Sequence, residues 1–228
     1  MTSVPTRPTL PAAVLFDMDG TLIDSEHLWL RAEIRTMERL GGSWSEADQA
    51  ACLGGPLERV VDYMIERAGG GHDPEAVAGH LLDDMESLLR SSPLVWQPGA
   101  RDLLLDARSQ GIPTALVSAS WNRLIDAVSD RIRSDVGQQA FDVVVAGDDV
   151  EQSKPHPEPY LQAAATLGVP PADCLVLEDS PPGVASGLAA GCTVVAIPHI
   201  ADIGTTDALV IASLEGWAVE SLWRAAAT

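Results

Sequence analysis

Short apolar runs that end in polar or acidic residues recur along the chain. The first spans residues 13–16 and is followed at once by Asp17. These runs are continuous rather than alternating, which is typical of strands that are buried on both faces of a parallel sheet. We therefore predict six strands, within residues 13–16, 114–117, 141–146, 174–177, 193–197 and 208–211.

Helical patterns separate these strands from about residue 98 onward. In the first of them, Leu103, Leu104 and Ala107 share one face, and Gly111 ends the pattern. The alternation of strands and helices predicts an α/β fold with a Rossmann-like open parallel sheet as its core. The expected helices lie within residues 99–110, 155–167 and 183–190.

Residues 24–96 carry no convincing strand pattern. Apolar stripes recur there with helical spacing, and runs of glycine separate them. We predict an α-helical cap domain of residues 24–96, inserted into a core domain of residues 12–23 and 97–228, with residues 1–11 as a disordered arm. The expected helices lie within residues 26–40, 45–53, 57–68 and 74–89.

Composition narrows the class of protein. The 228 residues include 14 Lys and Arg against 33 Asp and Glu, a net charge of −19, and 46% of them are hydrophobic, which fits a folded chain. Such acidity argues against nucleic acid or an anionic membrane as a partner. No apolar run reaches the roughly 18 residues of a membrane span. Three widely separated cysteines indicate reduced thiols in a cytoplasmic protein.

Two acids, Asp17 and Asp19, directly follow the first predicted strand, and Gly20 permits a turn there. Ligands of open α/β sheets bind beyond the carboxyl ends of the strands. Two carboxylates that converge repel each other and need a cation, and hard oxygen ligands suit Mg²⁺. The alternative interpretation is a solvated Asp-Gly turn.

Three further segments lie at the ends of predicted strands. Residues 118–120 read Ser-Ala-Ser, which could hold an anion at a helix N-terminus or simply cap the helix. Lys154 is the only lysine among 14 basic residues, and its ammonium group is a compact charge, although a lone lysine before a proline is often an exposed loop residue. Glu178 and Asp179 end an apolar run, either as metal ligands or as caps of the next helix.

The order of these motifs resembles the haloacid dehalogenase (HAD) superfamily. The chain reads DMDGT, then a serine after a strand, then Lys-Pro, then LEDSPPG, and the resemblance covers about residues 12–215. The helical insertion resembles the C1-type cap of the β-phosphoglucomutase-like and phosphoglycolate-phosphatase-like branch. These motifs identify a superfamily and not a substrate.

The resemblance implies a role for each motif residue. Asp17 would be the nucleophile that becomes an aspartyl phosphate, and Asp19 would protonate the leaving oxygen and then activate water. Gly54 and Gly55 in the cap loop permit close approach of the backbone to a substrate, or they form a plain turn between two helices. The phosphate would be bound by Thr21, Ser118, Ala119 and Lys154, and Mg²⁺ would be held by Asp17, the Asp19 carbonyl, Glu178 and Asp179.

These roles predict a HAD-like phosphatase that hydrolyses a small phosphomonoester with Mg²⁺. Asp19 argues against dehalogenation, which has no leaving alcohol to protonate, and a cap without lysine excludes the Schiff-base cleavage of phosphonates. The expected partner is a small phosphorylated metabolite, and we expect a monomer or a weak homodimer.

Two other functions stay open. A β-phosphoglucomutase-like phosphosugar mutase would fit Ser120 and Asn122, but the cap loop lacks Lys and Arg, and Trp29 replaces an expected histidine. Arg59 is the nearest charge that could hold a second phosphate, although one arginine a turn into a helix is more often a surface residue. A non-catalytic protein that binds a phosphate ligand is the other alternative.

Overall fold

The computed structural model describes residues 8–52, 57–137 and 139–226. In this part of the chain, six strands form one sheet in the order β3-β2-β1-β4-β5-β6, and every neighbouring pair is parallel. This confirms the predicted Rossmann-like α/β fold. The strands are β1 (Ala13–Phe16), β2 (Thr114–Val117), β3 (Val143–Val145), β4 (Cys174–Glu178), β5 (Thr193–Ala196) and β6 (Leu209–Val210).

Both faces of the sheet are covered by helices. In β1, Val14 and Phe16 lie in one apolar core, and Ala13 and Leu15 lie in another. Because every residue of β1 is buried, its sequence is continuously apolar. The first core includes residues of α5 (Ala100–Ser109), α6 (Asn122–Val136) and α9 (Val219–Ala225), and the second includes residues of α7 (Glu158–Leu167) and α8 (Pro181–Ala189).

Helices α6 and α9 were not among the helices predicted from the sequence. In α6 the buried residues Leu124, Ile125, Val128 and Ile132 recur with helical spacing, so the local pattern did carry the signal. Strand β3 is also shorter than the predicted run 141–146, since Phe141 precedes it. Short 3₁₀ turns, η1 (Gly147–Asp149) and η2 (Pro171–Asp173), lie in the connections.

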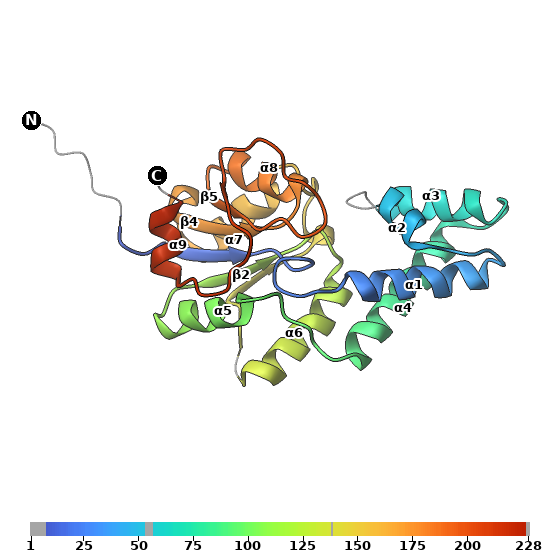
Figure 1. Ribbon diagram of the computed structural model, residues 1–228, viewed down its shortest axis with the longest axis horizontal. Helices are drawn as coiled ribbons and strands as arrows, with labels where there is room; N and C mark the ends of the chain where they lie inside the picture. Colours follow the sequence, from blue (N-terminus) through green and yellow to red (C-terminus); the bar gives the residue numbers. More distant parts are fainter. Residues whose placement is uncertain (1–7, 53–56, 138, 227–228) are drawn as a thin grey trace, which may run out of the picture.

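Between β1 and β2 the chain forms a separate helical unit. It consists of α1 (Glu26–Arg39), α2 (Glu46–Cys52), α3 (Leu57–Arg67) and α4 (Pro74–Ser91), which lie to one side of the sheet (Figure 1). Helix α4 begins where Asp73 accepts a hydrogen bond from the Ala76 N–H and Pro74 fixes the first turn. It packs on α1 and α3 and also on α6 of the core.

The two chain crossings between the helical unit and the core lie side by side. Ile23 and Trp96 form an antiparallel bridge. The Asp24 N–H donates to the Val95 carbonyl at 2.9 Å, and the Gln97 N–H donates to the Leu22 carbonyl at 2.9 Å. The paired crossings hold the start of α1 next to the turn that follows β1.

The N-terminal arm predicted for residues 1–11 extends too far. Its last four residues are described by the structure, and Trp223 Nε1 donates to the Pro8 carbonyl at 3.0 Å. Pro11 is buried, and Leu10 packs against the core. Residues 8–11 therefore belong to the folded core, while residues 1–7 lie outside the described part of the chain.

Two expectations from composition can be compared with the structure. Cys52, Cys174 and Cys192 are buried and free, as expected for reduced thiols. None of the helices in the described ranges combines the length and the apolar character that a bilayer crossing needs.

One buried hydroxyl in α1 generates a stability prediction. Thr36 is fully buried, and its Oγ1 finds no hydrogen-bond partner among the described residues. Thr36→Val replaces this unsatisfied group by a methyl of similar shape, so we expect the free energy of unfolding to rise by about 1 kcal/mol. Urea titration followed by circular dichroism measures the change.

The matched control is Thr114→Val. Thr114 is equally buried, but its Oγ1 donates to the Ala140 carbonyl at 2.7 Å. This variant loses a hydrogen bond and should be destabilised by about 1–3 kcal/mol. Equal destabilisation by both changes would show that Thr36 is satisfied in solution.

Candidate active site

The predicted nucleophile and two of the predicted metal ligands meet at the carboxyl ends of the two central strands. Asp17 follows β1, and Glu178 and Asp179 lie at the end of β4, which is the neighbour of β1. The strand order reverses between β1 and β4, and at such a point the loops diverge and leave a crevice. The Asp17 N–H donates to the Leu177 carbonyl at 3.0 Å, which extends the ladder to the first site residue.

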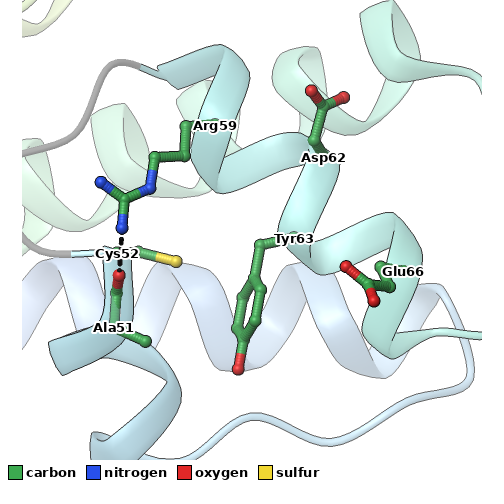
Figure 2. Close-up of a pocket in the computed structure, with 6 residues that line it drawn as sticks. All are labelled: Ala51, Cys52, Arg59, Asp62, Tyr63 and Glu66. Carbon is green, nitrogen blue, oxygen red and sulfur yellow. Dashed lines mark hydrogen bonds between the residues drawn. The ribbon is translucent and has the colours of Figure 1, made fainter.

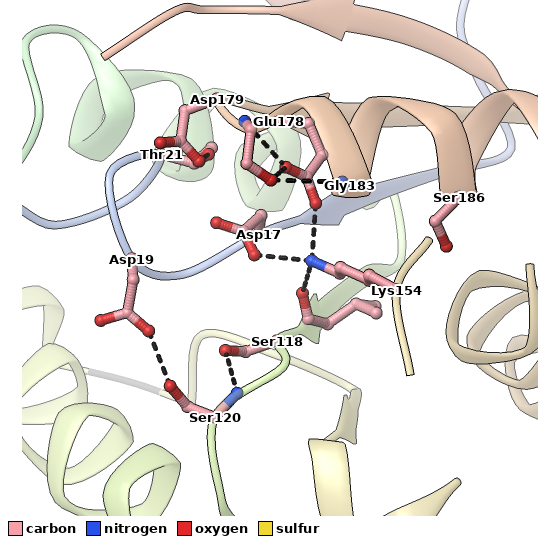
Figure 3. A network of polar contacts seen from close by, with 12 residues as sticks. Asp17, Asp19, Thr21, Ser118, Ser120, Lys154, Glu178, Asp179, Gly183 and Ser186 are labelled. Atoms are coloured by element: carbon pink, nitrogen blue, oxygen red, sulfur yellow. Dashed lines mark hydrogen bonds and ion pairs between the residues drawn. The ribbon is translucent and has the colours of Figure 1, made fainter. Parts of the chain in front are cut away.

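Lys154 lies at the centre of the site (Figure 3). Its Nζ donates to Asp17 Oδ1 at 2.6 Å, to Glu178 Oε1 at 2.6 Å and to the Val117 carbonyl at 2.9 Å. Only 5% of its side chain is exposed. Burial alone would lower the pKa of Lys154, but the Asp17 and Glu178 carboxylates raise it above its ordinary value. The only lysine of the sequence is therefore a buried, charged group.

Glu178 is held from several sides. Tyr160 donates its hydroxyl to Oε1 at 2.7 Å, and Ser180 donates its hydroxyl to Oε2 at 3.1 Å. The carboxylate is fully buried, and Gly183 provides the space for it, because a Cβ at Gly183 would lie 1.9 Å from the Glu178 Cδ. The strand end, α7 and α8 thus fix a carboxylate that in turn orients Lys154.

Three carboxylates form a group that could hold a cation. Oxygens of Asp17, Glu178 and Asp179 all lie within 4.8 Å of one another. Burial and the Glu178 carboxylate raise the pKa of Asp17, and burial and the Asp17 carboxylate raise the pKa of Asp179. A buried group of like charges is relieved by a bound cation, and oxygen donors fit Mg²⁺. The donor set therefore fits the cofactor implied by the resemblance.

The turn after β1 places Thr21 and Gly20 against Asp179. Thr21 donates its hydroxyl to Asp179 Oδ1 at 3.2 Å, so in this structure it orients a carboxylate of the cation group. Gly20 has a φ of +87°, and a Cβ there would lie 2.2 Å from Asp179 Oδ2. Only glycine satisfies both the backbone conformation and this close approach.

Asp19 is directed away from the carboxylate group. Its Oδ1 accepts a hydrogen bond from Ser25 at 2.5 Å, and its Oδ2 accepts one from Ser120 at 2.9 Å. Burial raises the pKa of Asp19, and hydrogen bonds from the two serines and from Trp29 oppose that rise. Among the described residues, its side chain is outside the group that could hold a cation. The expected metal contact through its main-chain carbonyl stays a prediction.

The loop after β2 brings Ser118 to the same edge of the sheet. The Ser118 side chain is buried, and its Oγ accepts a hydrogen bond from the Ser120 N–H at 3.0 Å. Its own proton is therefore available to donate. Ala119 is exposed, and its N–H donates to no other group in the described part of the chain. Both groups could face an anion, as the sequence predicted.

The predicted substrate loop lies outside the described residues, since these omit Gly54 and Gly55. Among the described residues, a hollow of about 390 Å³ lies between α2 and α3, and Arg59, Cys52 and Tyr63 are among its lining residues (Figure 2). Arg59 Nη2 donates to the Ala51 carbonyl at 2.8 Å. This contact ties α3 to the end of α2.

Several residues of the site were not predicted from the sequence. Tyr160, Ser25 and Gly183 contact or make room for the predicted groups, whereas Ser120 was noted in the possible anion-holding segment 118–120 and in a mutase-like pattern, without a link to Asp19. Tyr160 is one of only two tyrosines in the chain, and it lies five residues after Lys154-Pro155, in the first turn of α7, which is a weak signal. Ser120 and Tyr160 meet partners 101 and 18 positions away, so no local pattern pairs them. Ser25 and Gly183 lie within six positions of Asp19 and Glu178, but the sequence does not show that they come into contact.

Fold and site together define a class of protein. The structure combines a parallel sheet and a helical insertion after β1 with a buried lysine between two carboxylates. An acidic group that could hold a cation lies at the switch point, which is typical of an enzyme active site. The model of the haloacid dehalogenase-like hydrolase family matches residues 14–197. The chain therefore belongs to the haloacid dehalogenase-like hydrolases.

Curated relatives agree with this class. The chain is 35% identical to hexitol phosphatase B of Escherichia coli over 189 residues, which cover 82% of this chain and 83% of the relative. It is 33% identical to the protein CbbY of Rhodobacter capsulatus over 192 residues, with 82% and 85% coverage. The family match and the named phosphatase among these relatives confirm the predicted enzyme class, a HAD-like phosphatase.

Solved structures show the same architecture. CbbY of Rhodobacter sphaeroides in complex with phosphate superposes with a TM-score of 0.81 at 25% identity, and the match covers 93% of this chain and 99% of that one. A variant of the same protein in complex with xylulose-1,5-bisphosphate matches with a TM-score of 0.80 at 26% identity, over 93% of this chain and 99% of that one.

The close approach of Gly183 to Glu178 generates a prediction. Gly183→Ala places a methyl group on the Glu178 carboxyl, so the carboxylate must move and its contact with Lys154 is lost. We expect kcat for phosphate release to fall at least ~10-fold, because a misplaced charge weakens the positioning of the reacting groups. Steady-state kinetics on the purified variant measure this.

Gly79→Ala is the matched control. Gly79 lies within α4, and a Cβ there meets nothing within 4 Å. Alanine should leave kcat unchanged and stabilise the helix by up to about 1 kcal/mol. Full activity of Gly183→Ala would mean that the Glu178 contact is not needed.

Proposed function

We propose that this enzyme hydrolyses small phosphomonoesters with Mg²⁺ through a phosphoryl group carried on Asp17. The observation that carries the proposal is the Lys154 ammonium between Asp17 and Glu178, with Asp179 at the same point. An attacking carboxylate and a phosphate are both anionic, and a site that brings them together must supply positive charge. Lys154 supplies one such charge.

The chain's own residues have separate tasks in this reaction. An oxygen of Asp17 bonds to phosphorus while the bond from phosphorus to the ester oxygen breaks, and Asp19 gives its proton to that oxygen. Asp19 then takes a proton from a water molecule, whose oxygen bonds to phosphorus and releases Asp17 as a carboxylate. Ser118 donates to a phosphate oxygen. Bound Mg²⁺ would neutralise phosphate and carboxylate oxygens.

The names of the relatives guide the choice of substrate. Hexitol phosphatases A and B of Escherichia coli are 32% and 35% identical to this chain. Other relatives are named a probable pseudouridine-5′-phosphatase and a riboflavin kinase/FMN phosphatase. The compounds in these names carry hydroxylated carbon chains or rings. We therefore propose phosphates of sugars or sugar alcohols as the substrate class.

The mutase alternative needs a second phosphate site. Ser120 and Asn122, which resemble the mutase pattern, both have other partners: Ser120 donates to Asp19, and Asn122 Nδ2 donates to Asp149 Oδ1 at 2.8 Å. Arg59 is engaged by the Ala51 carbonyl. These contacts favour hydrolysis over transfer between two positions of one sugar.

Asp17→Asn tests the proposed nucleophile. The amide keeps the size of the carboxyl group but is a far weaker nucleophile, so phosphate release from hexitol 6-phosphates should fall below about 1% of wild type. Colorimetric phosphate assays measure release, and chromatography of the products separates hydrolysis from isomerisation. Interconversion of hexose 1- and 6-phosphates without release would establish the mutase, and no turnover of any phosphoester by the wild type would favour a binding protein.

Metal removal tests the proposed cofactor. Dialysis against EDTA should abolish phosphate release, and added Mg²⁺ should restore it, because the carboxylate group repels phosphate without a cation. Asp179→Asn should raise the Mg²⁺ concentration for half-maximal activity at least ~10-fold, since a ligand is weakened. The exposed Asp83, which lies on α4, provides the control Asp83→Asn, with unchanged Mg²⁺ dependence. Full activity in EDTA would contradict the proposed cofactor.

A further inference from the structure

The backbone of Ser120 is fixed on both sides. Its N–H donates to Ser118 Oγ at 3.0 Å, and its carbonyl accepts from the Gly147 N–H at 2.9 Å. Gly147 can approach this loop because it has no side chain: a Cβ there would lie 2.3 Å from the Ala119 carbonyl oxygen. Only 7% of Ser120 is exposed. The direction of its side chain is therefore set by the loop after β2 and by η1.

That side chain points at Asp19 (Figure 3). The Ser120 hydroxyl donates to Asp19 Oδ2 at 2.9 Å, across 101 positions of sequence. Ser25 donates to the other oxygen of Asp19 at 2.5 Å and is itself fully buried. With a hydrogen bond on each oxygen, from two different segments, the carboxyl plane of Asp19 is defined and its rotation is restricted.

The same residue also acts on Ser118. A hydroxyl oxygen that accepts a hydrogen bond directs its own proton elsewhere. Because the Ser120 N–H occupies an acceptor position of Ser118 Oγ, the Ser118 proton is directed away from this N–H and is available for a phosphate oxygen. One residue thus connects a group expected to bind phosphate with the expected acid and base.

We propose that Ser120 is a positioning residue for catalysis, which orients the Asp19 carboxyl group through its hydroxyl and the Ser118 hydroxyl through its N–H. The inference rests on the proposed phosphatase activity and deepens it. It also accounts for the Ser-x-Ser pattern after β2: the first serine meets the phosphate, and the second holds the proton-transfer group. In this role Ser120 acts through Asp19 and Ser118 and gives no hydrogen bond to the phosphate itself.

The two tasks separate when the hydroxyl alone is removed. Ser120→Ala keeps the N–H that holds Ser118 and loses the hydrogen bond to Asp19. Substrates differ in how much their leaving group needs a proton. The alkoxide that leaves from an alkyl phosphate, such as a hexitol 6-phosphate, is a poor leaving group, whereas the phenolate that leaves from p-nitrophenyl phosphate is stable without a proton. A defect in positioning Asp19 should therefore depend on the leaving group.

The experiment compares wild type, Ser120→Ala and Ser120→Thr with both substrates. For Ser120→Ala we expect kcat on the hexitol phosphate to fall ~10–100-fold, within the range that general acid–base catalysis contributes. The single-turnover release of p-nitrophenol and the inhibition constant of inorganic phosphate should change less than about 3-fold, because neither needs the proton of Asp19. Single turnover isolates the first chemical step from the later hydrolysis, which does need Asp19.

Two further variants complete the test. Ser120→Thr retains a hydroxyl and should recover most of the lost kcat. Ser129→Ala is the matched control, because Ser129 lies on α6 and its Oγ has no hydrogen-bond partner among the described residues. It should leave both substrates unaffected.

The outcomes distinguish a failure of the positioning role of Ser120 from a failure of the proposed phosphatase activity. Equal slowing of both substrates in Ser120→Ala, unchanged turnover of the hexitol phosphate, or no recovery in Ser120→Thr would each overturn the positioning role. A wild type that releases phosphate from neither substrate would overturn the proposed function, and this inference with it.

Discussion

The site depends on the ion pairs that the buried ammonium group of Lys154 forms with Asp17 and Glu178. A buried lysine is costly unless it is paired, and here two carboxylates and the Val117 carbonyl surround it. With Asp179 beside them, the carboxylates still outnumber the lysine. This deficit of positive charge suits a bound cation, which together with Lys154 would supply the positive charge that the proposed phosphate binding needs.

Close backbone approach is the second constraint. Gly20, Gly147 and Gly183 each lie where a Cβ would collide with a neighbouring atom of the site, namely with Asp179, the Ala119 carbonyl and Glu178. Three loops at the carboxyl edge of the sheet can therefore converge to hydrogen-bonding distance. The parallel strands β1, β2, β3 and β4 supply this edge, because their carboxyl ends all point the same way.

The start of the helical unit lies close to the candidate active site. The chain leaves the turn after β1, makes a bridge from Ile23 to Trp96, and enters α1 at Ser25 and Glu26. Ser25 contacts Asp19 directly, so the start of the helical unit and the candidate acid share a hydrogen bond. A displacement of α1 would therefore change the contact of Asp19 directly. Asp17 is held instead by Lys154 and by the β4 backbone.

The sequence by itself determined the sheet, the helical insertion and the residues at the strand ends, because buried strands and polar loop residues are local patterns. It also contained α6, whose spacing was regular although we did not predict it. Only the tertiary structure decided that Tyr160, Ser25 and Ser120 serve the site, and that residues 8–11 join the core. Except for Ser25 and Asp19, which are six positions apart, these contacts link distant positions of the chain. No local pattern encodes which group a hydroxyl will meet after folding.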